Sequence, residues 1–243
     1  MSFHLLPLTS PLEVAMLYKT PRFRPMGDRA LLVELGDGID PEVNRKVRGL
    51  LLALEQKRIP GVKDLVPSFR SLMVVYHPLE LSSATLQKVV DDLWKQSDAS
   101  RLPGPKLVEV PVVYGGKYGP DLAWVASFHG LSIEEVTRYH ALPTYQVYMI
   151  GFTPGFPYLG EVPEAIATPR RETPRTLVPQ GSVAIAQRQT GIYPVKSPGG
   201  WHILGWTPLT LFDAEKRPPS LLEMGDRVKF IPVQEEDISE WKR

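Results

Sequence analysis

The chain has 243 residues, of which 43% are hydrophobic, and its 28 basic and 27 acidic residues leave a formal net charge of +1. A chain of this length and composition fills one large or two small globular cores. The nearly balanced charge argues against a general nucleic-acid-binding or membrane-surface-binding protein, since both need a clustered basic excess. The absence of cysteine excludes thiol nucleophiles, disulfides and cysteine-ligated zinc, and it fits a reducing compartment.

The sequence also lacks the patterns of metal sites and membrane segments. Its five histidines show no HExxH or other metal-ligand spacing, so we expect no protein-bound metal. No segment approaches the roughly 18 uninterrupted apolar residues of a membrane-spanning helix. Pro7 and Pro11 interrupt the mildly apolar start, and no basic region precedes it, which argues against a signal peptide. We therefore expect a cytoplasmic protein.

Residues 1–105 predict a small α/β domain with a flexible N-terminus. An apolar run at 30–35 and further runs at 62–66 and 71–76 are typical of strands. Asp40 is placed as an N-cap and Pro41 as the first helical residue, and the helix ends before Pro60. Its apolar face comprises Val43, Val47, Leu50, Leu51 and Leu54. Ser82 or Ser83 caps a second helix, so a βαββα layer with helices on one sheet face is expected.

The polar segment 97–105, SDASRLPGP, has the composition of a linker. Residues 106–243 then predict a strand at 107–114, a helix from Pro120-Asp121 to Gly130, and a helix with the capping box Ser132 and Glu135. Short apolar runs at 147–152, 182–186, 201–205 and 227–231 alternate with Gly/Pro turns, which indicates an all-β barrel. The predicted fold class is α+β.

Two histidines fall at or near the ends of the predicted helices. His129 and His140 are each explained by a favourable helix-dipole contact or by simple surface exposure at least as well as by catalysis.

The segment from Thr173 to Phe212 contains no Asp or Glu. It is nevertheless rich in cationic, amide, hydroxyl and aromatic side chains, namely Arg175, Gln180, Arg188, Gln189, Thr190, Tyr193, Lys196, Trp201 and His202. Such a surface suits an anionic or amide-bearing ligand, and it does not suit a carboxylate pair acting as acid and base. The alternative is a β-rich domain with many tight turns.

Five ordered motifs carry a resemblance: GFTPGFPYLG (151–160), PRRETPR (169–175), VPQGSVAIA (178–186), QTGIYP (189–194) and SPGGWHILGWTP (197–208). They closely resemble the KipI family, also called allophanate hydrolase subunit 1, which is similar to the B subunit of bacterial ATP-dependent 5-oxoprolinase. The resemblance implies a small α/β domain followed by a cyclophilin-like β-barrel. It also implies two partners: the C subunit, a related barrel protein of the KipA or allophanate hydrolase subunit 2 type, and the A subunit. Together these proteins convert 5-oxoproline to glutamate with ATP hydrolysis.

The chain departs from the family pattern at two places. Gln187 stands where we expect glycine, which puts the turn before Gln189 in doubt because glycine often supplies a positive φ. Lys117 follows Gly116 where an acidic residue is expected, and this reversed charge could alter a partner contact.

The resemblance implies roles for the residues of these motifs. Arg170 and Arg175 are expected to grip a substrate carboxylate or a transferring phosphate, and Arg171 to be solvated. Gln189, Thr190 and Tyr193 would orient the lactam. Walls of the site would come from Phe156, Tyr158 and Trp201, and a backbone donor pair from Gly181 and Ser182. Each of these roles has a structural alternative. The two arginines could instead bind backbone carbonyls, and the aromatic residues could belong to the core or to an interface. Gly181 and Ser182 could form a turn and have no role in binding.

The chain has no GxxxxGK[ST] loop and no GxGxxG after a strand. ATP, with its Mg²⁺, is therefore expected at a partner or a shared interface, and the chain alone is expected to be inactive. Three other functions stay open: a KipI-type regulator that inhibits a sporulation histidine kinase, part of a hydrolase of allophanate or a related urea-derived amide, and a proline isomerase suggested by the barrel fold alone.

Overall fold

A computed structural model describes residues 16–96 and 102–241. The chain divides between Leu102 and Pro103 into two compact units, which are described separately. The expected flexible N-terminus and residues 97–101 of the expected linker lie outside the described residues.

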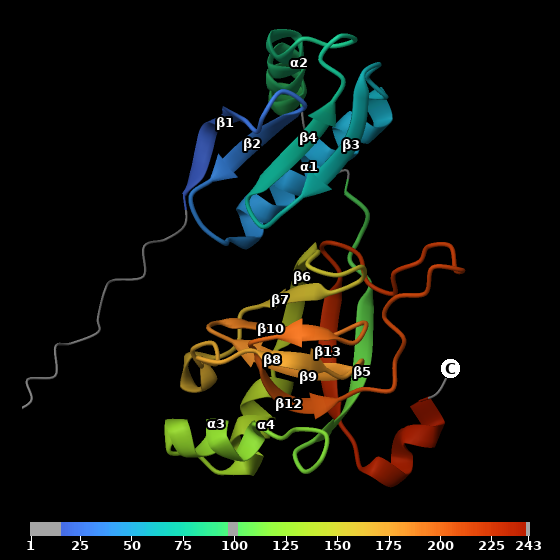
Figure 1. Ribbon diagram of the computed structural model, residues 1–243. Helices are drawn as coiled ribbons and strands as arrows, with labels where there is room; N and C mark the ends of the chain where they lie inside the picture. Colours follow the sequence, from blue (N-terminus) through green and yellow to red (C-terminus); the bar gives the residue numbers. More distant parts are fainter. Residues whose placement is uncertain (1–15, 97–101, 242–243) are drawn as a thin grey trace, which may run out of the picture. The chain divides into compact units, whose positions relative to one another are not determined.

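The first unit is a four-stranded antiparallel sheet in the order β1-β2-β4-β3, with two helices (Figure 1). Its elements are β1 (Leu17–Pro25), β2 (Ala30–Gly36), α1 (Pro41–Lys57), β3 (Val62–Pro67), β4 (Ser71–Tyr76) and α2 (Ser83–Gln96). Both helix starts form as predicted, because side-chain oxygens accept from free backbone N–H groups. The Asp40 carboxylate accepts from Glu42 N at 2.7 Å and the Ser82 hydroxyl from Thr85 N at 3.1 Å.

The sequence pattern missed strand β1. Its sequence, LYKTPRFRP, has a single fully buried residue, Pro21, so it lacks the apolar alternation by which the other strands were found. Pairing with β2 on one side holds it at the edge of the sheet. The buried Glu34 of β2 adds ion pairs with Arg24 of β1 and with Arg70.

The second unit is a closed barrel in the order β10-β7-β6-β13-β5-β12-β9, which confirms the predicted α+β class with a β-barrel. Its strands are β5 (Leu107–Tyr114), β6 (Thr144–Ile150), β7 (Pro157–Gly160), β9 (Ser182–Ala186), β10 (Gln189–Ile192), β12 (His202–Trp206) and β13 (Arg227–Pro232). A separate ribbon pairs β8 (Arg175–Val178) with β11 (Ser197–Gly199).

Two short helices, α3 (Leu122–His129) and α4 (Ile133–Ala141), lie side by side next to the barrel (Figure 1). The capping box of Ser132 and Glu135 begins α4 as predicted. Two 3₁₀ segments, η2 (Glu164–Ile166) and η3 (Glu235–Trp241), complete the unit. Within the described ranges, no helix is both long and apolar enough to span a bilayer.

His140 lies in the last turn of α4, as predicted, but its side chain is in the barrel core, so the expected surface exposure or charged helix-dipole contact was wrong. Its side chain is fully buried, with Nδ1 2.7 Å from the Tyr114 hydroxyl and Nε2 2.8 Å from the Thr190 hydroxyl. Because Thr190 donates to the Ala184 carbonyl, its oxygen accepts from Nε2–H, and Nδ1 accepts from Tyr114. Burial lowers the pKa of His140 to about 3, so this histidine is a neutral core residue.

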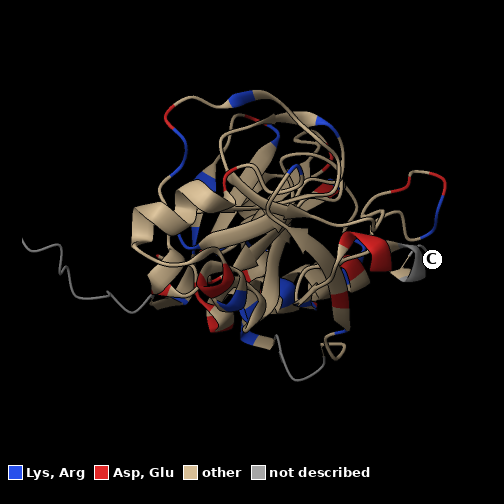
Figure 2. Cartoon of the chain, turned by 90° about the horizontal axis from the view of Figure 1, so that it is seen from below, with Lys and Arg blue, Asp and Glu red and all other residues tan. Residues whose placement is uncertain are grey.

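The structure shows the backbone conformation of Gln187 and the contacts of Lys117, the two residues that depart from the family pattern. Gln187 has φ 53° in the turn between β9 and β10, so this position does adopt the backbone conformation that favours glycine. Lys117 contacts the chain itself: its ammonium lies 2.6 Å from the Glu235 carboxylate. Figure 2 shows the acidic residues of η3, which include Glu235, beside the C-terminal end.

Candidate functional site

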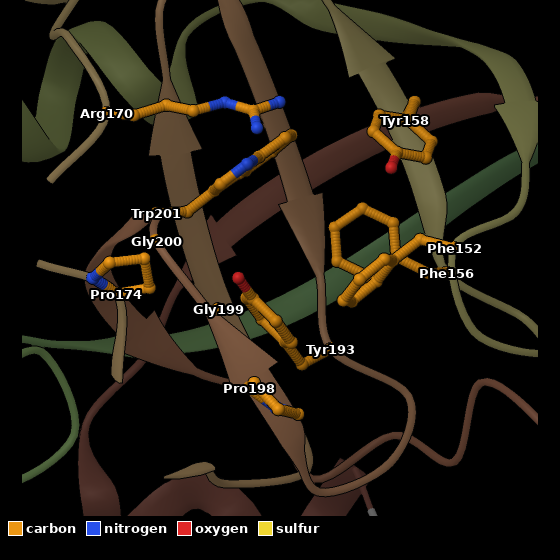
Figure 3. A pocket seen from close by; sticks show the side chains of 10 residues that line it. All are labelled: Phe152, Phe156, Tyr158, Arg170, Pro174, Tyr193, Pro198, Gly199, Gly200 and Trp201. Carbon is orange, nitrogen blue, oxygen red and sulfur yellow. The ribbon is translucent and has the colours of Figure 1, made fainter. Parts of the chain in front are cut away.

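A pocket of about 310 Å³ opens on the second unit, and we call it the aromatic pocket (Figure 3). Segments distant in the sequence build it: the β6–β7 turn with β7, the segment between η2 and β8, and the segment from the end of β10 to the start of β12. Its lining residues are Phe152, Phe156, Tyr158, Arg170, Pro174, Tyr193, Pro198, Gly199, Gly200 and Trp201.

Phe156 is the centre of the aromatic wall. Its ring is only 2% exposed and meets Tyr193 edge-on at 5.2 Å and Trp201 edge-on at 5.5 Å between ring centroids. It also packs at a tilt against Tyr158 at 4.9 Å. Edge-to-face contacts of this kind fix ring orientations, so the pocket has a preformed apolar wall suited to a small ring.

The Tyr193 hydroxyl is the best-defined polar group of the pocket. Burial raises the pKa of Tyr193 to about 12, while a hydrogen bond from the Trp201 backbone N–H opposes this shift. The hydroxyl is therefore neutral, and because its oxygen already accepts from Trp201, its hydrogen can be donated to a ligand. A Cβ at Gly199 would lie 2.2 Å from this hydroxyl oxygen, so the close approach requires glycine.

Arg170 supplies the cation of the pocket. Its side chain is exposed and, among the described residues, makes no ion pair with a carboxylate. Figure 3 shows its guanidinium next to Trp201 and directed toward Tyr158. Its charge acts on both Tyr158 and Tyr193. The guanidinium is thus available to an anionic ligand beside the aromatic wall.

Arg175 lies outside the aromatic pocket and has a different partner. It donates two hydrogen bonds to the Asp121 carboxylate, at 2.7 and 2.8 Å, and Arg171 adds a third at 3.0 Å. The Ile203 backbone N–H donates a fourth at 2.7 Å. The expectation that Arg175 grips a ligand and that Arg171 is solvated is corrected accordingly, because both guanidinium groups donate to one buried carboxylate at the start of α3.

This carboxylate cluster organises the pocket walls. Asp121 does not cap its own helix and instead joins the 169–175 segment to the start of β12. The Arg171 N–H also donates to the Gly200 carbonyl at 2.9 Å. Arg170 and Trp201, which flank these contacts in the sequence, are thereby held on the same side of the aromatic pocket.

Four other expected site residues do not line the pocket. The N–H groups of Gly181 and Ser182 donate to the Tyr193 and Pro179 carbonyls, so no backbone donor pair remains for an anion. Thr190 is buried and bonded to His140 and Ala184. Gln189 pairs with Gly160 on β7, and its amide nitrogen has no partner within the described part of the chain.

A second pocket of about 590 Å³ shares Arg170 with the first, and sequence reasoning missed it. Its walls are α3, the 169–173 segment and the start of β12, through Asp121, Trp124, Phe128, Pro169, Arg170, Arg171, Glu172, Thr173 and His202. Trp124 and Phe128, four residues apart on α3, were the available signal, because this spacing places both rings on one helix face. No cluster of three or more metal-ligating side chains occurs in the parts of the chain that the structure describes.

Comparison with protein families matches residues 21–222 to the carboxyltransferase domain, subdomain C and D. The chain is 39% identical over 231 residues to the 5-oxoprolinase B subunit of Bacillus subtilis (strain 168), covering 89% of this chain and 95% of that protein. It is 41% identical over 212 residues to the protein of the same name from Escherichia coli O157:H7, covering 86% and 95%.

Among solved structures, TTHA0988 superposes with a TM-score of 0.76 at 41% identity. The match covers 85% of this chain, which spans 40% of the TTHA0988 chain. The urea amidolyase of Saccharomyces cerevisiae is 26% identical over 250 residues, covering 89% of this chain and 13% of that protein. The chain belongs to the carboxyltransferase subdomain C and D family, and within it to the group of proteins named as the B subunit of 5-oxoprolinase.

Proposed function

We propose that this chain is the B subunit of an ATP-dependent 5-oxoprolinase and that the aromatic pocket binds 5-oxoproline. Two relatives of that name at 39% and 41% identity match it over 95% of their length. The observation that carries the proposal is the Arg170 guanidinium, which pairs with no carboxylate of the described residues, beside a preformed aromatic wall with a neutral hydroxyl donor.

The pocket offers one group for each feature of the substrate. A five-membered lactam with a carboxylate needs an apolar surface for its ring methylenes, a cation for the carboxylate and a donor for the carbonyl oxygen. Phe156 and Trp201 provide the surface, Arg170 the cation and Tyr193 the donor. At about 310 Å³, the pocket is at the small end of the range for ligand sites, which suits a molecule of this size.

The hydroxyl donor matters most if the lactam oxygen gains charge during the reaction. A lactam resists water, and ATP activates it by phosphorylation of the carbonyl oxygen. A fixed donor at that oxygen is worth more in a buried site than in water. The chain has no phosphate loop of its own, so we propose that ATP and its Mg²⁺ bind at a partner or a shared interface, and that turnover requires the A and C subunits.

The test is reconstitution with the two partner proteins and measurement of 5-oxoproline-dependent ATP hydrolysis. Arg170→Gln should raise KM for 5-oxoproline strongly, and Tyr193→Phe should lower kcat about 10- to 100-fold, since a donor to a developing oxyanion is lost. Arg227→Gln, which removes an exposed arginine of β13, is the matched control. Wild-type kinetics in both pocket variants would show that the substrate binds elsewhere.

A second candidate rests on the likeness to urea amidolyase. Allophanate has an amide, a planar carbonyl group and a carboxylate, and the same three pocket groups could bind it. A parallel assay with allophanate in place of 5-oxoproline separates the two: 5-oxoproline should stimulate ATP hydrolysis and yield glutamate without ammonia, whereas ammonia release from allophanate would favour the second candidate.

A further inference from the structure

Phe152, in the turn between β6 and β7, has a backbone conformation that is unfavourable for a bulky residue. Its φ is 66°, in the left-handed region that side chains of this size rarely adopt. The Thr153 N–H donates to the Gly151 carbonyl at 2.8 Å, which closes a three-residue γ-turn with Phe152 at its centre. Such turns with a positive central φ are rare and strained. Glycine would be the unstrained residue at this position.

The surrounding contacts hold this γ-turn in place. The Gly151 N–H donates to the Phe156 carbonyl at 3.0 Å, and the Phe156 N–H donates to the Thr153 carbonyl at 3.1 Å. A Cβ at Gly155 would lie 2.6 Å from the Phe212 Cβ atom, so the loop packs directly against the neighbouring chain. Hydrogen bonds within the loop and close packing behind it therefore maintain the strained backbone.

Folding of the chain does not explain why a phenylalanine stands here. The Phe152 ring is 62% exposed, and it meets the Phe156 ring edge-on at 5.7 Å between centroids. A ring that stays exposed contributes little burial free energy to the core. The other non-glycine residues with a positive φ among the described ones, Arg58 and Gln187, do not line the aromatic pocket, whereas Phe152 does. Strain that is retained at a ligand-facing residue is typical of a binding site.

Phe152 is also the most exposed aromatic residue of the pocket. Phe156, Tyr193 and Trp201 are at most 5% exposed, so their rings form a fixed wall. Figure 3 shows Phe152 beside Phe156, with Arg170 on the other side of the pocket in that view. A small ring that packs on the fixed wall, with its carboxylate at Arg170, leaves one face toward solvent. Phe152 reaches that face by a change of side-chain rotamer, without movement of the backbone.

We infer that Phe152 is the specificity-determining residue of the aromatic pocket: its ring covers the open face of a bound five-membered ring, and the strained γ-turn positions it to do so. The identity of that ligand as 5-oxoproline rests on the proposed function. Contact between the two rings buries apolar surface on both, which offsets the strain that the free chain carries. An acyclic amide offers no ring face, so Phe152 favours cyclic over acyclic amides that carry a carboxylate.

The first experiment measures KM and kcat for 5-oxoproline in the complex reconstituted with the A and C subunits. Phe152→Gly and Phe152→Ala should each raise KM about tenfold and change kcat less than threefold, because the ring contact is lost in the ground state and the transition state alike. Phe152→Tyr keeps the ring, and its KM should stay within twofold of the wild-type value.

Thermal unfolding of the same variants separates binding from stability. Both small residues remove the ring, but only alanine keeps a Cβ in the left-handed conformation. Phe152→Gly should therefore unfold about 3 °C above Phe152→Ala, which is the reverse of the order at an unstrained position. The KM values of these two variants should nevertheless agree within twofold. A purely structural role would make KM follow the Tm instead.

The matched control is Gln187→Gly, which relieves a φ of 53° in an exposed turn outside the pocket. It should raise Tm and leave KM unchanged.

Two competitive inhibitors separate the ring from the amide. Cyclopentanecarboxylate keeps the ring and the carboxylate, so Phe152→Gly should weaken its inhibition by the same factor as KM rises. N-acetylglycine keeps the amide and the carboxylate without a ring, and its inhibition constant should change less than twofold. Equal effects of Phe152→Gly on both inhibitors would contradict selection by the ring face.

An unchanged KM in Phe152→Gly, while Arg170→Gln still raises KM, would overturn this inference and leave the proposed function intact. A wild-type complex in which 5-oxoproline stimulates no ATP hydrolysis would refute the proposed function, and with it the ligand assigned to Phe152. Weaker assembly of the Phe152→Gly complex in size-exclusion chromatography, with an unchanged KM at saturating partner concentrations, would overturn the inference and identify Phe152 as a partner contact.

Discussion

Replacement of Asp121 by Asn tests whether one carboxylate holds the walls of both pockets together. Asp121 accepts three hydrogen bonds from Arg171 and Arg175 and one from the Ile203 N–H. Asn keeps the shape but removes the charge and places an amide N–H₂ group against guanidinium donors. The two guanidinium groups then lose the negative charge and one of the two acceptor oxygens that they contact.

The expected cost follows from burial. The Asp121 side chain is 6% exposed, and those of Arg171 and Arg175 are 31% and 23% exposed. Removal of one partner from a buried pair costs about 3–5 kcal/mol, and the partial exposure of the arginines favours the lower end, about 3 kcal/mol. For a unit of this size, that corresponds to a Tm lowered by about 10 °C.

The assay is thermal unfolding followed by near-ultraviolet circular dichroism, with Glu161→Gln as the control. Glu161 pairs with Arg188 on the surface, where both side chains are about 40% exposed, and such pairs contribute about 0–1 kcal/mol. The control should therefore shift Tm by no more than about 3 °C.

The pH dependence of the Tm difference between wild type and Asp121→Asn is the stricter test of this reasoning. Burial by itself raises the pKa of Asp121, but the hydrogen bonds from Arg175 and Ile203 and the charges of both arginines lower it overall. A carboxylate with a lowered folded-state pKa stabilises the protein above its unfolded-state pKa, and this stability is lost as the pH falls through the folded-state value. The Tm gap between wild type and Asp121→Asn should narrow below pH 4. A gap smaller than about 3 °C at pH 7, or one that stays constant down to pH 3, would refute the reasoning.

Arg175→Lys should lower stability by about 2 kcal/mol in urea unfolding yet leave kcat/KM of the folded complex nearly unchanged, since lysine cannot make the two-pronged contact to Asp121; a stable but inactive variant would contradict this. Gly199→Ala should displace the Tyr193 hydroxyl and cost about 1–3 kcal/mol, whereas Gly200→Ala, where a Cβ meets nothing nearer than 3.6 Å, should be tolerated. Gln187→Gly should raise stability by about 0.5–1 kcal/mol by relieving the positive φ, and an unchanged or lowered Tm would count against it. The pKa of His140 falls from 6.5 to about 3 on folding, so protonation favours the unfolded chain below pH 6.5. The free energy of unfolding should therefore be about 2 kcal/mol lower at pH 5 than above pH 6.5, and His140→Gln should lack this dependence.

Local signals in the sequence predicted the elements that local contacts determine. The caps at Asp40, Ser82 and Ser132 act within four residues of themselves, so their positions could be read directly from the chain. The Gly/Pro-punctuated apolar runs likewise predicted a barrel. Strand β1 has no such signal, because it is defined by pairing with β2 at a sheet edge rather than by its own apolar pattern.

The spacing of His140 and Thr190 relative to apolar residues indicates that both side chains are buried. His140 lies four residues after the buried Val136 and so shares its helix face. Thr190 pairs with the buried Leu159 across the sheet, and alternation along β10 places it inside the barrel while Gly191 lies against the Phe156 ring on the other face. Reading chemistry from residue type alone, without these periodicities, placed both histidine and threonine on the wrong side of the structure.

The segment from Thr173 to Phe212 contains no acidic residue, but it does not follow that its basic residues are free to bind an anionic ligand. Asp121, 54 residues before Arg175, enters the same region from α3 and is bound by two of the three neighbouring arginines. No local pattern distinguishes Arg170 from Arg171 or Arg175, because which guanidinium remains unpaired depends on which ones reach a distant carboxylate. The tertiary fold therefore determines which arginine can bind a ligand. Asp121 accepts hydrogen bonds from Arg171 and Arg175, and Arg170, which lines both pockets, pairs with no described carboxylate.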